Sequence, residues 1–179
     1  MNIFYLHEDP ATCAEMHVDK HCVKMIVEYA QLLSTTHRVL DGTEVVELGK
    51  SGRKVKRWRL SDEREKDLYL ACHINHPSSI WLRKSDKNYK YLFFLYSHLC
   101  DEYTYRYEKI HKTESLKSWL STLPNNIPTS NFTQPTPAMP EDCKIVGNSL
   151  KSYRKYYIQN KSHIAKWKKR SIPDWYITK

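Results

Sequence analysis

One segment constrains the fold of this chain more than any other: residues 16–40, MHVDKHCVKMIVEYAQLLSTTHRVL. Apolar side chains recur there every three or four residues, and this spacing predicts a helix with one buried face. The expected buried stripe consists of Val18, Cys22, Met25, Ile26, Tyr29, Leu32, Leu33, Thr36, Val39 and Leu40. Asp9 suits an N-cap and Pro10 suits the first helical position. We therefore expect one helix from Pro10 to about Leu40, which Gly42 ends.

The rest of the chain predicts more helices and a single insertion. Two valine-rich runs flank a Gly-Lys-Ser-Gly turn, which predicts an inserted basic β-hairpin over residues 41–60. Further helices are expected at Asp62 to about His73, Ile80–Lys84, Ser85 or Asp86 to about Lys109, in SLKSWLSTL, and at Gly147–Lys166. Residues 124–140 contain five prolines and no charge, which predicts an ordered strap. We expect a mainly α fold, a compact single-domain helical bundle over residues 1–179.

Basic residues are concentrated in two places. The net charge is +9. Residues 147–179, the expected C-terminal helix and tail, carry nine Lys or Arg and one acid, and the hairpin run KSGRKVKRWR carries six basic residues and no acid. Aromatic side chains lie between these cations, and such patches favour a polyanion as partner. A solvated basic surface is the simpler alternative.

Several classes of protein are disfavoured. Only four glycines occur, with neither a Walker A nor a GxGxxG motif, so we expect no nucleotide cofactor. No apolar run reaches the roughly 18 residues of a membrane span, so no membrane partner is expected. Five cysteines occur without a CxxC pair or a signal peptide, which predicts free thiols and a cytoplasmic location.

The other side of the expected first helix carries a single file of polar residues. They are His17, His21, Lys24, Glu28, Gln31, Thr35 and Arg38, spaced three or four apart and therefore on one face beside the apolar stripe. A carboxylate at such a border can be partly desolvated, which favours its use as a base. The simpler alternative is an i,i+4 salt bridge between Lys24 and Glu28. A zinc site at His17 and His21 is disfavoured because HxxxH lacks a glutamate between the histidines, so we expect no metal.

Four short motifs carry a resemblance to a known family. The run VDKHCVKMIVEYAQLL contains Lys20, His21, Lys24 and Glu28 in one pattern. Later motifs are Asn75-His76-Pro77 with Trp81, then Glu102-Tyr103 with Arg106, and finally RSIPDWY with Trp175. In these residues the chain resembles the phage pyrimidine-dimer DNA glycosylase/AP lyase group and its bacterial relatives. The opening MNIFYL also resembles uncharacterised phage proteins, which implies a phage origin and action in the host cytoplasm.

The resemblance implies a metal-independent reaction at a deoxyribose. In that family the N-terminal amine attacks C1′ and a glutamate, here Glu28, stabilises the cationic sugar and moves protons. An α-amine suits this reaction because such groups ordinarily have a pKa of about 8. Because Asn2 is too large for removal of the initiator methionine, the amine would belong to Met1. Lys24, one turn before Glu28, is the alternative nucleophile.

The resemblance implies double-stranded DNA as the partner, and the remaining candidate residues would bind it. His21 and Arg38 are expected to position phosphate or sugar, and Trp175 to stack on a base or dock the tail. Other candidates for sugar or phosphate contacts are Lys20, Asn75, His76, Arg106, Lys109, Lys166, Lys168, Lys169 and Arg170. The expected function is a DNA glycosylase with possible AP lyase activity. The alternatives are a non-catalytic nucleic-acid-binding accessory protein and a DNA- or nucleotide-modifying transferase on the same fold.

Overall fold

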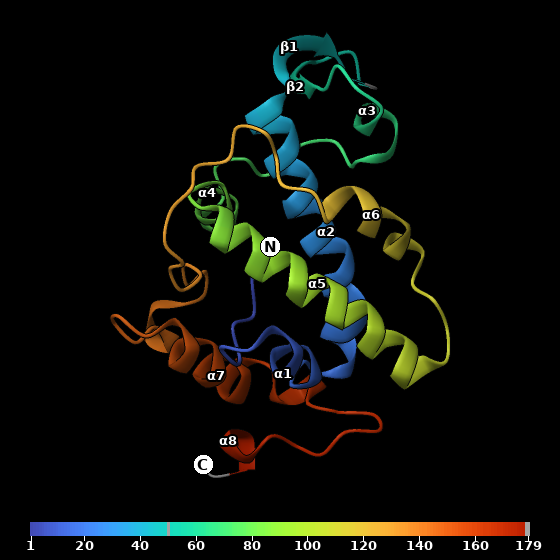
Figure 1. Cartoon of the computed structure of the whole chain (residues 1–179). Helices are drawn as coiled ribbons and strands as arrows, with labels where there is room; N and C mark the ends of the chain where they lie inside the picture. The colour runs from blue at the N-terminus through green and yellow to red at the C-terminus, as the bar shows by residue number, and fades with distance from the viewer. Residues whose placement is uncertain (50, 178–179) are drawn as a thin grey trace.

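Two long helices, α2 (Asp19–Asp41) and α5 (Asp86–Tyr107), pack against each other at the centre of the molecule (Figure 1). The computed structural model describes residues 1–49 and 51–177, so the predicted hairpin residue Lys50 and the last two residues of the predicted tail lie outside the described residues. The other elements are α1 (Pro10–Glu15), β1 (Thr43–Leu48), β2 (Lys54–Arg59), α3 (Arg64–Asp67), α4 (Pro77–Arg83), α6 (Lys117–Leu120), α7 (Ser149–Asn160), α8 (Asp174–Ile177), and three 3₁₀ turns at Lys112–Leu116, Glu141–Cys143 and Ser162–Ile164. The mainly α fold with one inserted hairpin is confirmed.

The prediction of a continuous first helix is wrong, because the chain breaks between α1 and α2. Val18 is extended, with φ −62° and ψ 155°. His17 fills the gap: its Nδ1 lies 2.7 Å from the carbonyl oxygen of Cys13 and its Nε2 lies 3.0 Å from the hydroxyl of Tyr29. The backbone N–H of Asp19 donates to the carbonyl of Lys166 at 2.8 Å. The nearby Cys13 and the more distant Tyr29 and Lys166 thus provide partners for polar groups at the break between the helices.

Other predicted helices have different bounds. The helix expected from Asp62 to about His73 is wrong except for the short α3, and the last helix ends at Asn160 instead of near Lys166. Helix α4 begins at Pro77, earlier than expected, because His76 forms its N-cap. Ser85 caps α5 as predicted, and residues 124–140 contain no helix or strand, as expected of a strap.

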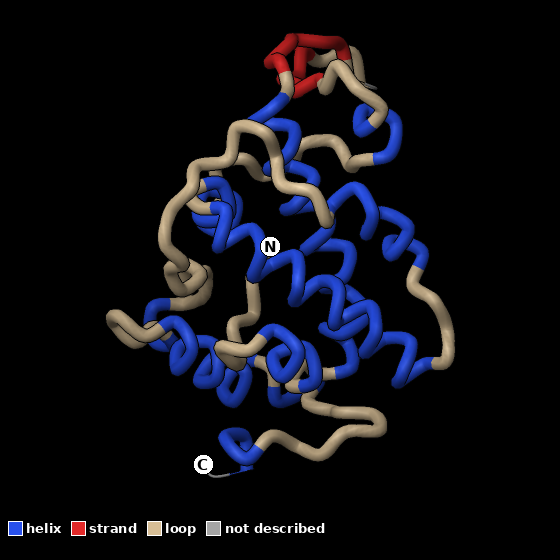
Figure 2. Tube along the Cα trace, in the orientation of Figure 1, coloured by secondary structure: helices blue, strands red, loops and turns tan. Residues whose placement is uncertain are grey.

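The hairpin lies beyond the C-terminal end of α2, at the opposite end of the molecule from α7 and α8 (Figure 2). Strands β1 and β2 are antiparallel, with Thr43 opposite Arg59 and Leu48 opposite Lys54. Gly42 joins α2 directly to β1. A Cβ at this position would lie 2.5 Å from the carbonyl oxygen of Arg38, so only glycine fits this close passage of the backbone.

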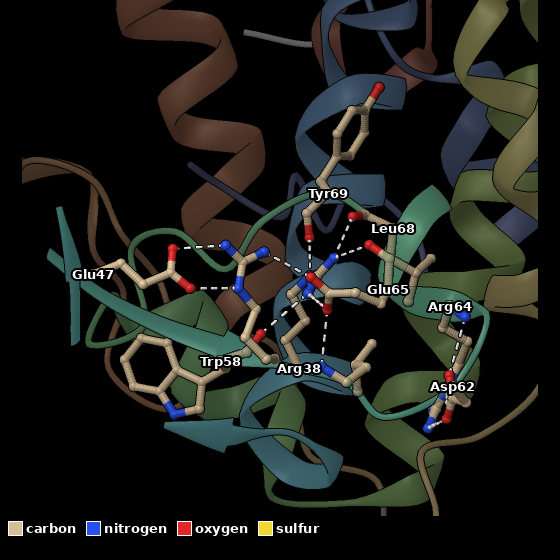
Figure 3. A network of polar contacts seen from close by, with 10 residues as sticks. Arg38, Glu47, Trp58, Asp62, Arg64, Glu65, Leu68 and Tyr69 are labelled. Carbon is tan, nitrogen blue, oxygen red and sulfur yellow. Dashed lines mark hydrogen bonds and ion pairs between the residues drawn. The ribbon is translucent and has the colours of Figure 1, made fainter. Parts of the chain in front are cut away.

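A network around Arg38 fastens the base of the hairpin (Figure 3). Arg38 is 1% exposed, and its guanidinium uses all five N–H donors. The acceptors are the carbonyl oxygens of Trp58, Glu65, Leu68 and Tyr69 and the carboxylate of Glu65. Glu65 also accepts from Arg59 at 2.7 Å, and Arg59 binds Glu47 through two hydrogen bonds of 2.6 Å. The backbone carbonyls of Glu65, Leu68 and Tyr69 accept hydrogen bonds from Arg38. Because they do not accept from the N–H groups of a following helical turn, the chain after α3 is irregular.

We expect Arg38→Ala to lower the free energy of unfolding by about 3–5 kcal/mol, because it removes the donor of four carbonyls and one of the donors to the Glu65 carboxylate. Urea unfolding followed by circular dichroism measures the change. Lys56→Ala is the matched control, because Lys56 forms an exposed pair with Glu44 that contributes less than about 1 kcal/mol. Equal effects of the two substitutions would show that the Arg38 network does not hold this region.

Candidate functional site

The middle of α2 presents Glu28 between two amines. Its side chain is 17% exposed, at the edge of the core. The Nζ of Lys24 lies 3.0 Å from Oε1 of Glu28, one helical turn away. The α-amine of Met1 lies 4.0 Å from Oε2 of the same carboxylate. The structure therefore brings together the three residues that the sequence proposed for catalysis: Met1, Lys24 and Glu28.

The N-terminal segment is held against α2 and α4, which fixes the position of Met1. Ile3, Phe4, Tyr5 and Leu6 are buried. The backbone N–H of Phe4 donates to the hydroxyl of Tyr29 at 3.1 Å, and the hydroxyl of Ser78 donates to the carbonyl of Met1 at 3.4 Å. The side chain of Met1 is only 7% exposed and packs on the core. Sequence reasoning missed Ser78, because nothing local indicates a contact between residues 77 positions apart.

His76 is the fourth polar group of this site. Its Nδ1 accepts the N–H of Ser78 at 3.2 Å and caps α4. Burial lowers the pKa of His76, and the positive charges of the Met1 amine and His73 lower it further, while Glu28 acts in the opposite direction. A neutral imidazole therefore stands near both Met1 and Glu28.

The loop that carries His76 is held at both ends. The hydroxyl of Thr35 donates to the carbonyl of Cys72 and accepts from its N–H, and Arg83 donates to the carbonyl of Ile74 at 2.8 Å. His73 adopts a left-handed backbone with φ 48°, which is strained for a residue other than glycine. Asn75, another predicted contact, is exposed beside His76. The site thus combines two amines, one carboxylate and one imidazole on a fixed frame.

The prediction that His21 binds phosphate or sugar is wrong. Its ring is 6% exposed and stacks on Phe4 with centroids 4.2 Å apart. Its Nδ1 lies 2.7 Å from the hydroxyl of Tyr157. Burial lowers the pKa of His21 to about 3, so the ring is neutral at physiological pH. His21 joins α7 to α2 and cannot attract an anion.

The predictions that Arg38 and Arg106 bind DNA are also wrong, because both guanidinium groups are buried and used inside the protein. Arg38 holds the hairpin, as described above. Arg106 is fully buried and binds Glu102 at 2.6 Å and Asp19 at 2.9 Å. It also donates to the carbonyls of Glu15 and His17, across the break between α1 and α2. A buried arginine with these partners has a structural role.

Two of the predicted C-terminal cations are paired with acids. Lys169 lies 2.6 Å from Glu108, and Arg170 lies 2.8 Å from Glu102. Burial would raise the pKa of Glu102, but hydrogen bonds from Arg170 and Arg106 outweigh it, and the pKa is lowered. Glu102 is therefore a stable anion that anchors the C-terminal segment to α5.

The other predicted cations are exposed. Lys20, Lys109 and Lys166 form no ion pair among the described residues, and Lys168 lies over the ring of Tyr107 at 5.3 Å. Lys20, Lys166 and Lys168 lie at the start of α2, because Asp19 binds the backbone of both Lys166 and Lys168. Trp175 was predicted either to stack on a base or to dock the tail. Its position fits docking of the tail, because its Nε1 lies 3.3 Å from the sulfur of Met16.

A hollow of about 600 Å³ lies away from Glu28, and sequence reasoning did not find it. Its aromatic walls come from Tyr5, Tyr91, Phe94 and Phe132, with Glu8 and Lys87 also lining it. Phe132 belongs to the 124–140 strap. Only the folded chain brings that strap beside the N-terminal segment and α5, so no local sequence signal marked this hollow.

Among residues 1–49 and 51–177, no group of three or more His, Cys, Asp or Glu side chains could hold a metal ion. No helix of that part of the chain is long and apolar enough to cross a bilayer. Comparison with known protein families, curated proteins and solved structures finds no match to this chain. The proposal for its function therefore rests on the site and on the short motifs.

Stability should fall as the pH decreases from 7 to 4.5, because three histidines are buried as neutral rings. Burial lowers the pKa of His17 and His37 to about 4 and that of His21 to about 3. In the unfolded chain these groups titrate near pH 6.5, so below that pH the unfolded state binds more protons. Each ring adds up to about 1.4 kcal/mol per pH unit to the slope of the free energy of unfolding against pH. Urea unfolding at several pH values measures this slope.

The variant His21→Gln tests this assignment. It keeps a polar side chain and removes one titrating group, so the slope should become shallower by up to about 1.4 kcal/mol per pH unit. His163→Gln removes an exposed histidine and should leave the slope unchanged. A slope that does not respond to His21→Gln contradicts the neutral, buried state of this ring.

Proposed function

We propose that the chain acts on DNA as a glycosylase with an AP lyase step, using the site at Met1, Lys24, Glu28 and His76. The observation that carries this proposal is the α-amine of Met1 at 4.0 Å from a carboxylate that is largely shielded from solvent. A nucleophilic amine beside a single acid is the pair of groups that imine chemistry at a deoxyribose requires. The resemblance to the glycosylase group and to phage proteins supports DNA in an infected cell as the substrate.

The reaction would proceed in balanced steps. The lone pair of the neutral amine attacks C1′, and the glycosidic C1′–N bond breaks with its electron pair leaving on the base, which takes up a proton. Glu28 accepts a proton from the amine, the ring C1′–O4′ bond opens with protonation of O4′, and an imine forms. Removal of a C2′ proton then expels the 3′ phosphate. Water hydrolyses the imine and returns the free amine.

The amine of Met1 is the better candidate for the nucleophile. Its side chain is buried and its backbone is fixed by Ser78, so the amine has a defined position. Lys24 is 70% exposed and already holds Glu28 at 3.0 Å, so nothing desolvates its ammonium. In this proposal Lys24 balances the charge of Glu28 and attracts phosphate.

A second candidate function is DNA binding without chemistry. It is favoured by the position of the 600 Å³ hollow, which Glu28 does not line. Under that function the exposed lysines at the start of α2 still bind phosphate, and the pair formed by Lys24 and Glu28 is a surface salt bridge. The two candidates differ in a single result, the capture of a covalent adduct.

Borohydride should trap a covalent complex between the protein and a duplex with one abasic site, because reduction of the imine links the amine to C1′. Glu28→Gln should reduce trapping and strand cleavage by at least about 100-fold, the lower end of the range for a general acid–base group, and leave DNA affinity nearly unchanged. Glu63→Gln, which changes an exposed glutamate, is the control. Full activity of Glu28→Gln contradicts this site, and no trapping by the wild-type protein favours the binding function.

Mass spectrometry of the trapped complex should place the adduct on the peptide that contains Met1. The intact mass of the protein shows beforehand whether Met1 carries a free amine. Lys24→Gln should still be trapped, because it leaves the α-amine in place. An adduct on Lys24, or loss of trapping in Lys24→Gln with normal DNA binding, would assign the nucleophile to Lys24 instead.

A further inference from the structure

The outer face of the hairpin exposes apolar side chains next to cations. Side chains alternate between the two faces of a strand, so Glu44, Val46 and Leu48 of β1 share a face with their partners Trp58, Lys56 and Lys54 of β2. Val46 is 61% exposed and Leu48 is 74% exposed. Each of these two aliphatic residues is directly opposite a lysine. Nothing in the described part of the chain covers this face.

The charge of the hairpin is only partly neutralised. Lys56 pairs with Glu44 at 2.7 Å, and Arg59 pairs with Glu47. These two glutamates are the only acids of the two strands. Three cations remain without an ion pair among the described residues: Arg53, Lys54 and Arg57. Arg53 and Lys54 therefore give the free end of the hairpin excess positive charge beside exposed aliphatic groups, whereas Arg57 is opposite Val45 on the other face.

The base of the hairpin is held firmly, in contrast to its open outer face. Figure 3 shows Arg38 and Glu65 beneath the strands, with Glu47 bound at the side. Gly42 leaves no flexible linker between α2 and β1. A ribbon mounted in this way keeps its orientation relative to α2, which lowers the entropy cost of binding a partner.

We propose that the outer face of the hairpin binds in the major groove of duplex DNA. Two paired strands lie about 4.7–4.9 Å apart, and the groove, about 12 Å wide, admits a two-stranded ribbon. Val46 and Leu48 contact thymine methyl groups, while Arg53 and Lys54 contact phosphates. Two aliphatic side chains offer far less apolar area than the roughly 800 Å² per partner of a standard protein interface. Unpaired cations are complementary to a polyanion.

This inference rests on the proposed action on DNA and adds the distance along the duplex between the hairpin and the reacting nucleotide. Asp41, at the end of α2, lies thirteen residues after Glu28. At 1.5 Å per residue this separation is about 20 Å along the helix axis. Base pairs are stacked about 3.4 Å apart, so a duplex parallel to α2 would place the base of the hairpin about six base pairs from the nucleotide at Glu28.

The test measures binding of an intact, AT-rich duplex by fluorescence anisotropy at several salt concentrations. The double variant Arg53→Gln/Lys54→Gln should reduce the slope of log K against log salt by about 2, because each phosphate contact contributes about 0.9. Leu48→Ser should weaken binding without changing this slope. Lys84→Gln/Lys112→Gln, which removes two exposed lysines far from the hairpin in sequence, should change neither quantity. Methyl green, a major-groove ligand, should compete with the protein, and the minor-groove ligand netropsin should not.

The outcomes separate the hairpin from the chemistry. The hairpin proposal is overturned if the hairpin variants bind duplex DNA with unchanged affinity and an unchanged salt slope. If borohydride still traps these variants on abasic DNA, the proposed function remains intact. Reduced slope in the hairpin variants with no trapping by the wild-type protein supports the hairpin and removes the glycosylase. An equal loss in the control pair, competition by netropsin alone, or no binding to duplex DNA also overturns the proposal.

Discussion

Helix α2 lies at the centre of this molecule, and nearly all of its buried polar side chains have partners, the hydroxyl of Ser34 being the exception among the described residues. An unpaired buried polar group costs about 1–3 kcal/mol. His37 meets this requirement through Tyr89 and Arg64, and Thr35 through both backbone groups of Cys72. Arg38 meets it through five hydrogen-bond donors. Tyr89 belongs to α5 and Trp58 to β2, whereas the other partners come from the briefly helical or irregular chain between Arg64 and Cys72. The polar side chains of α2 therefore help to determine where that part of the chain lies.

The same requirement attaches both basic regions to the ends of α2. At its start, Asp19 binds Arg106 and the backbone of Lys166 and Lys168, which holds the C-terminal segment in place. At its end, Arg38 fixes the hairpin. Glu28 lies between these two ends. A single rigid helix therefore sets the spacing between two cationic surfaces and one partly shielded carboxylate, and this spacing suits an extended polyanion.

Sequence patterns predicted what depends on neighbours in the chain. The apolar stripe of α2, the cap at Ser85 and the contact of Lys24 with Glu28 all follow from short spacings. The polar file was misinterpreted at His21 and Arg38, because their burial depends on Tyr157 and Glu65, which are distant in sequence. Periodicity cannot reveal that a helix is covered on its polar side as well. The approach of Met1 to Glu28 was expected only from the resemblance, since no local pattern indicates it.

The distances around Glu28 bear on whether an amine there can react. A nucleophilic amine must lose its proton, and a hydrogen bond to a carboxylate would favour the protonated form. Lys24 makes that close contact at 3.0 Å, whereas the amine of Met1, at 4.0 Å, lies beyond hydrogen-bond distance. Lys24 contacts Oε1 of Glu28, whereas the amine of Met1 approaches Oε2, so the two amines do not compete for the same oxygen. Glu28 can then receive a proton from Met1 through one bridging water, or directly after a small approach of the amine.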